Sequence, residues 1–529
     1  MPAHREPDSL KKQCLLWYFN CVFHKRKPID AKYVPVEIVD SIMQLSSEAQ
    51  VNGAHISQVY RMIELHGHHC RHIHLEFKEW VNVYPMRIEL LLNLISNNTN
   101  PFILKKFSIF GHSIPWNICD ISKCLINLNG LTFLKLYVHN LNDQILETIS
   151  KSCHNLEELY LQGMNFSNKS IVSLAGIGPN GEKELNKWSD RLGCPNLRIL
   201  MMLKESRTPP KFSFNAIVCL LENLSKLESI RIPHYCLTSA LIRLSSTGVK
   251  RLSNLSQYSA NFSTISYSDW SHISNILNKI IRLSPHLTDL NITIDIKTSF
   301  QCLYPLSKLQ HLHTFTITKA LRNTSKDEES NTENIDKYSN SSELVSIIAL
   351  FGHKLNHLEL HNIYSIDLKQ IIHFCPNLLE LEVTNVKQIT NNSNKLMSYR
   401  PNEELFKNLR HLKLFGHSEN RITANNLIEI LGFCQNLRFL KIGWCSSFDD
   451  YTIDRLLSMN HLRQLSHLEF HEMSEKLTID SVMQIIITRV MALSLHLLYC
   501  DGISCEDIEN LRQFVREFNI DLTLKYYYD

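Results

Sequence analysis

The sequence has almost no net charge. Its 529 residues include 55 lysines and arginines against 52 aspartates and glutamates, which gives a formal net charge of +3. Nucleic acids and anionic membranes attract proteins that concentrate positive charge. The balance therefore argues against both as partners and favours another protein.

Long apolar runs are also missing. A membrane-spanning helix needs about 18 or more uncharged apolar residues, and the longest candidate, residues 482–498, is interrupted by Gln484 and Arg489. The apolar stretch at residues 14–23 contains Asn20 and is not followed by a small-residue cleavage site, so we expect no signal peptide. Without an export signal, the 15 cysteines are expected to stay reduced. We expect a soluble protein of the cytoplasm, the nucleus or both.

The motifs of common catalytic chemistry are absent. There is no phosphate-binding Gly-x-x-x-x-Gly-Lys loop, no His-Glu-x-x-His, no Cys-x-x-Cys pair and no Gly-x-Ser-x-Gly elbow. A Gly-x-Gly-x-x-Gly occurs at Gly176, Gly178 and Gly181, but no expected strand precedes it, which favours a surface loop over a nucleotide site. The histidine-rich residues 66–74 lack the paired spacing of zinc ligands. We therefore expect no enzyme, no cofactor and no metal site.

A repeat fills most of the chain instead. Segments starting at Cys153, Cys194, Cys375 and Cys434 read Cys-x-Asn-Leu-x-x-Leu-x-apolar, and leucine or phenylalanine replaces the cysteine in other copies. The cysteine is therefore expected to be a small buried residue and not a reactive thiol. Roughly fifteen repeats are expected. The clearest copies have their first leucine at Leu104, Leu131, Leu156, Leu197, Leu227, Leu287, Leu312, Leu355, Leu378, Leu409, Leu437 and Leu465.

Each repeat predicts a strand followed by a helix. The spacing Leu-x-x-Leu-x-Leu turns alternate side chains into a core, whereas residues 142–152 and 423–433 carry apolar residues at helical spacing. One such unit cannot bury its own apolar face, so neighbours must stack in parallel. The pattern resembles the leucine-rich repeat family, particularly its cysteine-containing subtype. This resemblance implies an α/β solenoid, a curved horseshoe with parallel strands on the concave face and helices outside.

We expect two parts in the chain. Residues 61–529 form the solenoid, with loop insertions near residues 176–193 and 320–343, the second polar enough to be disordered. Residues 1–60 do not follow the repeat. Within them Leu10 and Cys14 share one face of an expected helix, and Val34-Pro35 begins a second amphipathic helix.

These two helices resemble the von Hippel-Lindau box of ubiquitin-ligase substrate receptors. The resemblance implies that the first helix binds Elongin B/C and the second binds cullin two. The implied adaptor contacts are Ser9, Leu10, Cys14 and Tyr18, and the implied cullin contacts are Val34, Pro35, Ile38 and Ile42. Tyr18 departs from the family pattern, which has a smaller aliphatic residue there. Together with the repeats, the box is similar to the zyg-eleven and PRAME-like receptors, and implies a non-catalytic substrate-recognition subunit of a cullin-RING ubiquitin ligase.

Two other interpretations remain open. Residues 34–45 also resemble the start of an F-box, which would bind a Skp-type adaptor, although the later part of that motif is not evident. Alternatively, the two helices only cap the first repeat, and the chain is a leucine-rich-repeat scaffold or inhibitor unrelated to ubiquitin.

The repeat also predicts where a target protein binds. Residues between the inward leucines point out of the strand face, so large aromatic side chains at those positions do not serve the core. Phe415, Phe439 and Trp444 fall at such positions on expected neighbouring strands. We expect them to form one patch of the kind that anchors a protein partner.

Overall fold

The computed structural model describes residues in two compact units, one ending at Leu255 and the other starting at Ser256, and each is considered by itself. The described residues are 63–64, 67–76, 85–111, 118–139, 141–162, 166–177, 193–203, 211–232, 234–246, 252–262, 270–320, 341–386, 388–390, 407–416, 423–432, 434–445, 447–460, 462–488 and 492–527. The predicted helices within residues 9–43 and most of both predicted insertions lie outside these ranges.

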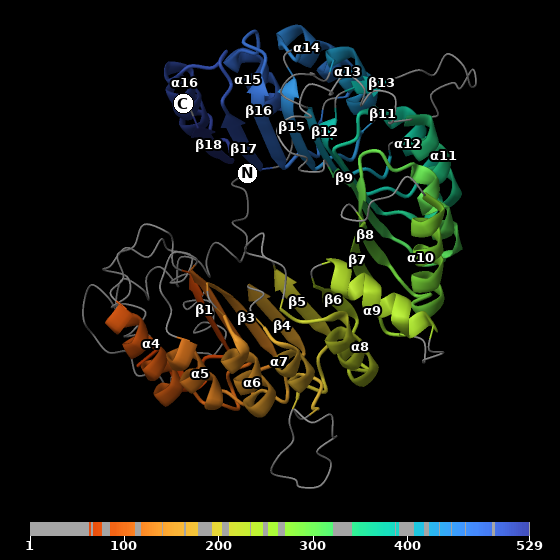
Figure 1. The fold of residues 1–529 in the computed structure, drawn as a ribbon. Coiled ribbons are helices and arrows are strands. Elements are labelled where there is room, and N and C mark those ends of the chain that lie inside the picture. The colour runs from red at the N-terminus through yellow and green to blue at the C-terminus, as the bar shows by residue number, and fades with distance from the viewer. Residues whose placement is uncertain are drawn as a thin grey trace, which may run out of the picture. The chain divides into compact units, whose positions relative to one another are not determined.

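The first unit alternates strands and helices in chain order (Figure 1). Its strands pair in parallel, each with the next along the chain. They are β1 (His72–Glu76), β2 (Lys106–Gly111), β3 (Phe133–Val138), β4 (Glu158–Gln162), β5 (Ile199–Leu203) and β6 (Ser229–Arg231). The helices are the short 3₁₀ helix η2 (Gly67–His69), α4 (Pro85–Asn98), α5 (Ile118–Ile126), α6 (Asp143–Ser152), α7 (Asn168–Ser173), α8 (Phe214–Asn223) and α9 (His234–Ser246).

The second unit continues the same alternation. Its parallel strands are β7 (Gln257–Asn261), β8 (Asp289–Asp295), β9 (Thr314–Ala320), β10 (His357–His361), β12 (Glu380–Val386), β14 (His411–Gly416), β15 (Phe439–Cys445), β16 (His467–Met473), β17 (Leu493–Leu498) and β18 (Leu522–Tyr527). Its helices are α10 (Trp270–Leu283), η3 (Phe300–Lys308), α11 (Ser341–Phe351), η5 (Gly352–Lys354), α12 (Leu368–Phe374), α13 (Ala424–Leu431), α14 (Asp450–Met459), α15 (Ile479–Thr488) and α16 (Cys505–Glu517). Two short strands, β11 (Ser365–Asp367) and β13 (Gln388–Thr390), pair separately.

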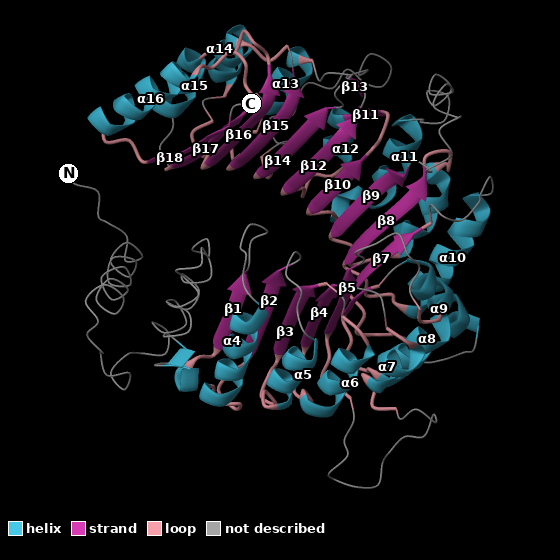
Figure 2. Ribbon diagram, turned by 60° about the vertical axis from the view of Figure 1, so that its left-hand side comes forward, coloured by secondary structure: helices cyan, strands magenta, loops and turns pink. Residues whose placement is uncertain are grey.

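Within each unit, the helices cover one face of the strands (Figure 2). All the frame leucines predicted from the sequence are at most 5% exposed, so they fill the layer between strands and helices. The described residues hold 16 strands of the main parallel arrangement, close to the predicted repeat number. The predicted class is therefore confirmed: the chain has the α/β fold of leucine-rich repeats. None of its described helices has the length and apolar character needed to cross a bilayer.

The cysteine and asparagine of the frame both have structural roles. Cys153, at 0% exposure, and Cys375, at 1%, are buried as predicted, and burial raises the pKa of each thiol to about 12. The asparagine amide donates a hydrogen bond to a backbone carbonyl of the preceding repeat. Asn377 Nδ2 lies 2.7 Å from the oxygen of His353, and Asn436 Nδ2 lies 2.7 Å from that of Lys407. These bonds satisfy carbonyls at the turn into each strand and tie neighbouring repeats together.

The first predicted insertion begins and ends at one point of the fold. Gly176 follows α7 and not a strand, and it has a φ of 75°. Gly193 has a φ of 101°, and a Cβ on it would lie 2.4 Å from the Gly176 nitrogen. Only glycine fits such a left-handed, close approach. Gly176 therefore lies where the two ends of the insertion meet at Gly193. Gly178 and Gly181 lie outside the described residues.

Candidate functional site

The strand face opposite the helices carries the outward side chains of each repeat, and we call it the open face. In the second unit it is richest in histidine, carboxylate and aromatic groups on β10, β12 and β14–β17. Most of these side chains are half-buried by their neighbours on adjacent strands. They are His357, Glu359, His361, Glu380, Glu382, His411, Lys413, Phe415, Phe439, Lys441, Trp444, His467, Glu469, His471 and His496.

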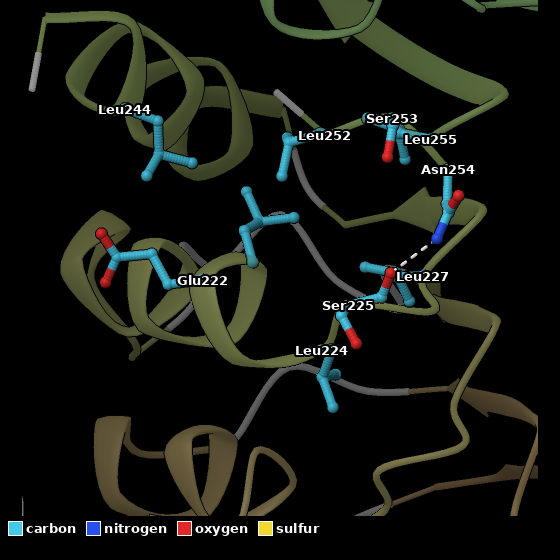
Figure 3. Close-up of a pocket in the computed structure, with 10 residues that line it drawn as sticks. Glu222, Leu224, Ser225, Leu227, Leu244, Leu252, Ser253, Asn254 and Leu255 are labelled. Atoms are coloured by element: carbon cyan, nitrogen blue, oxygen red, sulfur yellow. Dashed lines mark hydrogen bonds between the residues drawn. The ribbon is translucent and has the colours of Figure 1, made fainter. Parts of the chain in front are cut away.

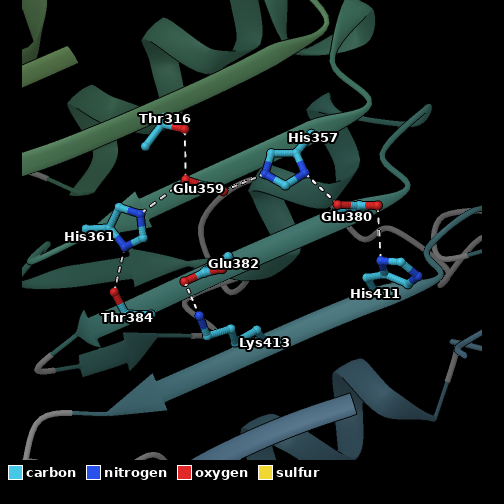
Figure 4. A network of polar contacts seen from close by, with 9 residues as sticks. All are labelled: Thr316, His357, Glu359, His361, Glu380, Glu382, Thr384, His411 and Lys413. Carbon is cyan, nitrogen blue, oxygen red and sulfur yellow. Dashed lines mark hydrogen bonds and ion pairs between the residues drawn. The ribbon is translucent and has the colours of Figure 1, made fainter. Parts of the chain in front are cut away.

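A network of histidines and glutamates lies across β10, β12 and β14 (Figure 4). His357 Nε2 lies 2.8 Å from Glu359 Oε1 and its Nδ1 lies 2.7 Å from Glu380 Oε2. Glu380 Oε1 lies 3.0 Å from His411 Nδ1. Because ionised carboxylates only accept hydrogen bonds, both ring nitrogens of His357 carry protons in this arrangement. The hydrogen bond with Glu359, opposed by burial and assisted by Glu380, raises the pKa of His357.

Glu359 is the centre of this network. Besides His357, it accepts a hydrogen bond from Thr316 Oγ1 at 2.9 Å and lies 3.4 Å from His361 Nε2. The hydrogen bond from His357 is the main reason that the pKa of Glu359 falls far below its usual range. On the next strands, Lys413 Nζ lies 2.5 Å from Glu382 Oε1. The network therefore fixes outward polar side chains in place.

Aromatic rings gather beside the network at the carboxyl ends of β14–β17. Phe415 and Trp444 lie 5.6 Å apart between ring centroids, and each contacts His471, at 5.8 Å and 5.6 Å. Tyr499 lies 5.5 Å from His471. We call these four residues the aromatic cluster. Edge-to-face contacts of this kind hold the rings in a defined arrangement.

The backbone of β15 turns Trp444 into the cluster. Trp444 was predicted to occupy an outward position, but strict alternation from the buried Leu440 and Ile442 would point it towards the core. Trp444 instead has a φ of 54°, in the left-handed region, and its indole Nε1 donates to Glu472 Oε2 at 2.6 Å. A left-handed backbone costs a non-glycine residue roughly 1–2 kcal/mol. Asn362, Asn385, Glu472 and Tyr499 have the same left-handed φ at the equivalent position of their repeats, so this backbone belongs to the repeat and turns the side chain at that position onto the open face.

Gly443 makes room for Phe415. A Cβ on Gly443 would lie 2.5 Å from a carbon of the Phe415 ring, so the ring rests directly on the glycine backbone. Phe415 and Gly443 are partners in the register between β14 and β15. The absence of a side chain at residue 443 therefore defines where the Phe415 ring lies.

The structure separates Phe439 from the other two predicted target residues. Phe439 is paired in register with His411, and its ring stacks on His467 with centroids 4.4 Å apart and an interplanar angle of 1°. Lys441 lies between the two groups on β15, with its ammonium 5.1 Å from the Phe415 centroid. The sequence predicted one patch. The structure brings Phe415 and Trp444 together and places Phe439 in a second group with histidines.

The open face of the first unit has a different composition. Lys135 Nζ lies 4.7 Å from the ring centroid of Phe110, 4.5 Å from that of Tyr137 and 5.6 Å from that of Tyr160. Burial lowers the pKa of Lys135, and burial together with a hydrogen bond to Glu158 raises the pKa of Tyr160 to about 12. Phe110 and Lys135 were not predicted as site residues, although both occupy outward positions of the strand pattern.

The histidines at residues 68–74, the part of the histidine-rich tract that the structure describes, do not converge on one point. His68 and His69 lie in η2, with ring centroids 6.5 Å apart, and His74 contacts Phe110 on the open face. Ile73 and Leu75, at 1% and 4% exposure, point inward as the strand pattern predicted. The tract therefore belongs to the first described repeat.

A cavity of about 200 Å³ lies beside α8 and α9 in the first unit (Figure 3). Leucines line most of it, including Leu221, Leu244 and Leu252, and the amide of Asn254 donates to the Ser225 carbonyl at 2.7 Å. Its lining offers few polar groups to orient a ligand, so we interpret it as a gap in packing.

Comparisons with known proteins add little to this description. No protein-family model and no curated protein sequence matches the chain. Among solved structures, an internalin from Listeria monocytogenes aligns at 14% identity and a TM-score of 0.30, covering 95% of this chain and 99% of that chain. The yeast Rad7 and Elc1 complex aligns at 14% identity and a TM-score of 0.36, covering 87% and 88%. The Drosophila Toll–Spatzle complex aligns at 12% and 0.29, covering 88% and 62%. At these scores the fold assignment rests on the strands and helices themselves.

Proposed function

We propose that this protein is a non-catalytic recognition subunit that binds a target protein through the open face of its second unit. The observation that carries the proposal is the aromatic cluster, in which Trp444 lies against Phe415 on the open face. Tryptophan and other large aromatic residues are the usual anchors of protein interfaces. Neither ring fills the core, because both lie on the open face and remain partly exposed.

The charged network beside the cluster supports the same function. Glu359, Glu380 and Glu382 each contact a basic side chain on the same or a neighbouring strand, so the surface is ordered before a partner arrives. An interface that is already ordered loses less conformational entropy on binding. Fixed charges around an apolar anchor also discriminate between partners.

The second part of the proposal concerns the partner proteins to which this protein would bring its target. The resemblance of residues 9–43 to a von Hippel-Lindau box supports Elongin B/C and cullin two as partners, and hence a role as substrate receptor of a cullin-RING ubiquitin ligase. This part rests on sequence alone, because those residues lie outside the described ranges. A Skp-type adaptor or a scaffold without a ligase would be the competing outcomes.

Affinity purification of the full chain from cells tests the adaptor assignment. We expect Elongin B/C and cullin two to co-purify with the wild-type chain. Replacing Leu10 by Ser and Cys14 by Phe changes both residues of the helix face that is expected to contact the adaptor. This variant should abolish Elongin recovery. The matched variant with Val34 and Pro35 replaced by Ala should keep Elongin and lose the cullin.

The same purification separates the competing interpretations. Recovery of a Skp-type adaptor would favour the F-box interpretation, and recovery of neither adaptor would favour the scaffold. Both variants must have the same circular dichroism spectrum as the wild type, which shows that they fold. If Elongin recovery is unchanged in the folded Leu10 and Cys14 variant, the von Hippel-Lindau box assignment is wrong.

A further inference from the structure

Two histidines and a glutamate converge between β16 and β17 on the open face of the second unit. His467 and Glu469 lie on β16, and His496 lies on β17 directly opposite Glu469 in the strand register. One ligand atom from each residue lies within 4.8 Å of the other two. Imidazole nitrogen and carboxylate oxygen are the ligand types of zinc and related divalent ions.

The distances in this group differ from those of the hydrogen-bonded network. Glu469 Oε2 lies 3.7 Å from His467 Nε2 and 3.5 Å from His496 Nδ1. In the network, by contrast, His357 and its carboxylates lie 2.7–2.8 Å apart, with a proton between each pair. Metal–ligand bonds of about 2.0–2.1 Å at tetrahedral angles put ligand atoms roughly 3.3–3.4 Å apart. The wider separations around Glu469 are therefore close to those around a bound ion.

The two oxygens of the Glu469 carboxylate face different partners. Lys441 Nζ contacts Oε1, whereas both histidine nitrogens face Oε2. The lysine ammonium repels a bound cation, but it occupies the oxygen that the histidines do not face.

Both imidazole rings are held by neighbours. His467 stacks on Phe439, and Ser494 Oγ lies 3.2 Å from the second ring nitrogen of His496. A hydrogen bond to the second nitrogen of a metal-binding histidine orients the ring, as Ser494 does here.

We propose that His467, Glu469 and His496 bind a divalent transition-metal ion of the zinc class on the open face. Three protein ligands of a four-coordinate ion leave one position for water or for a ligand from a bound protein. Because the group lies beside the aromatic cluster, an ion there would change the charge of the proposed target surface. The sequence motifs missed this site because its ligands come from two repeats, 27 residues apart from Glu469 to His496.

Metal titration of the purified full chain tests the site. The protein is prepared without a histidine tag, reduced and treated with chelator, and then titrated with Zn²⁺ in competition with a chromophoric chelator and with Co²⁺ by visible absorption. We expect about one ion per chain in excess of background, and d–d absorption typical of tetrahedral Co²⁺. Replacing His496 by Ala or Glu469 by Gln should weaken binding at this site by at least about tenfold.

The controls use the hydrogen-bonded network on the same face. His411→Ala and Glu380→Gln remove the same residue types without touching the proposed ligands, so the affinity and the Co²⁺ spectrum should stay as in the wild type. The tract at residues 66–74 remains intact in every variant and sets the background. Circular dichroism without metal verifies folding. If wild type and His496→Ala bind Zn²⁺ with equal affinity and stoichiometry, or if neither gives a tetrahedral Co²⁺ spectrum, the site does not exist. Both outcomes leave the proposed protein recognition intact.

Discussion

The open faces of the two units are built on the same repeat and carry different chemistry. In the first unit, Lys135 lies over the rings of Phe110, Tyr137 and Tyr160. In the second unit, Lys413 and Lys441 each contact a carboxylate. The first face therefore presents aromatic rings around a cation, and the second presents an ion-pair network with an aromatic cluster at one end.

This difference shows which positions of the repeat define the fold and which are free to vary. Leu134 and Leu136 in β3 occupy the same inward positions as Leu412 and Leu414 in β14, and all four are fully buried. The outward position before them holds Phe133 in one unit and His411 in the other. Only the outward positions differ in kind, so recognition can change along the chain without a change of fold.

The largest expected effect is on the inward positions, and it should be the same in both units. Leu136→Ala and Leu414→Ala each remove a side chain at 0% exposure. Each should lower the free energy of unfolding by about 3 kcal/mol, because a cavity remains where the side chain was. Urea denaturation measures this loss, with the outward Lys413→Ala as a control expected to lose under about 1 kcal/mol. A loss below about 1 kcal/mol in only one of the two leucine variants would show that the units do not share one core design.

The inward and outward positions of the repeat explain which parts of the fold could be predicted from the sequence. The leucines and cysteines could be predicted because their burial depends only on spacing along the chain. The helix at Asp143–Ser152 was predictable for the same reason, since Ile145, Leu146 and Ile149 recur on one face. The role of the frame asparagine was not foreseen, because its partner carbonyl belongs to the preceding repeat.

The candidate site was less predictable than the fold. Placing His357 between Glu359 and Glu380 needs the register between β10 and β12, and the spacing of successive repeats varies. The outward direction of Trp444 depends on a left-handed backbone that alternation does not predict. The separation of Phe439 from Phe415 depends on Lys441, whose length fills the space between them. The sequence could therefore place residues on the outward face, but the register between strands was needed to decide which of them are in contact.

A smaller effect should distinguish the two open faces as binding surfaces. Replacing Phe439 and Trp444 by Ala removes one ring from each aromatic group of the second unit. We expect capture of the target protein to weaken by about 2 kcal/mol or more, which is roughly thirtyfold. The matched variant replaces Phe133 and Tyr160, which lie 5.3 Å apart on the open face of the first unit, by Ala.

Quantitative capture by the wild type and both variants decides which face binds. The first-unit variant should retain the target, and both variants should keep their thermal stability, since none of the four rings fills the core. Equal capture by the wild type and the Phe439 and Trp444 variant would exclude the proposed face. Loss of capture in the Phe133 and Tyr160 variant alone would move the site to the first unit.

The smallest expected effect is a pH dependence that belongs only to the second unit. The pKa of His357 is raised in the folded chain above its usual value of 6.5, so its contribution to stability is complete below about pH 6.5 and is lost as pH rises through the folded pKa. The lowered pKa of Glu359 keeps that carboxylate charged throughout this window. His357→Gln should therefore lower the free energy of unfolding by about 1 kcal/mol at pH 6 and by less at pH 9, because the pair is half-buried and partly screened. Urea denaturation at both pH values measures the change.

Glu359→Gln in the same background should add no further pH dependence, since the pairing is already removed. If the effect of His357→Gln is equal at pH 6 and pH 9, the histidine is not charged by its carboxylates, and the second open face does not carry the fixed charges that set it apart from the first.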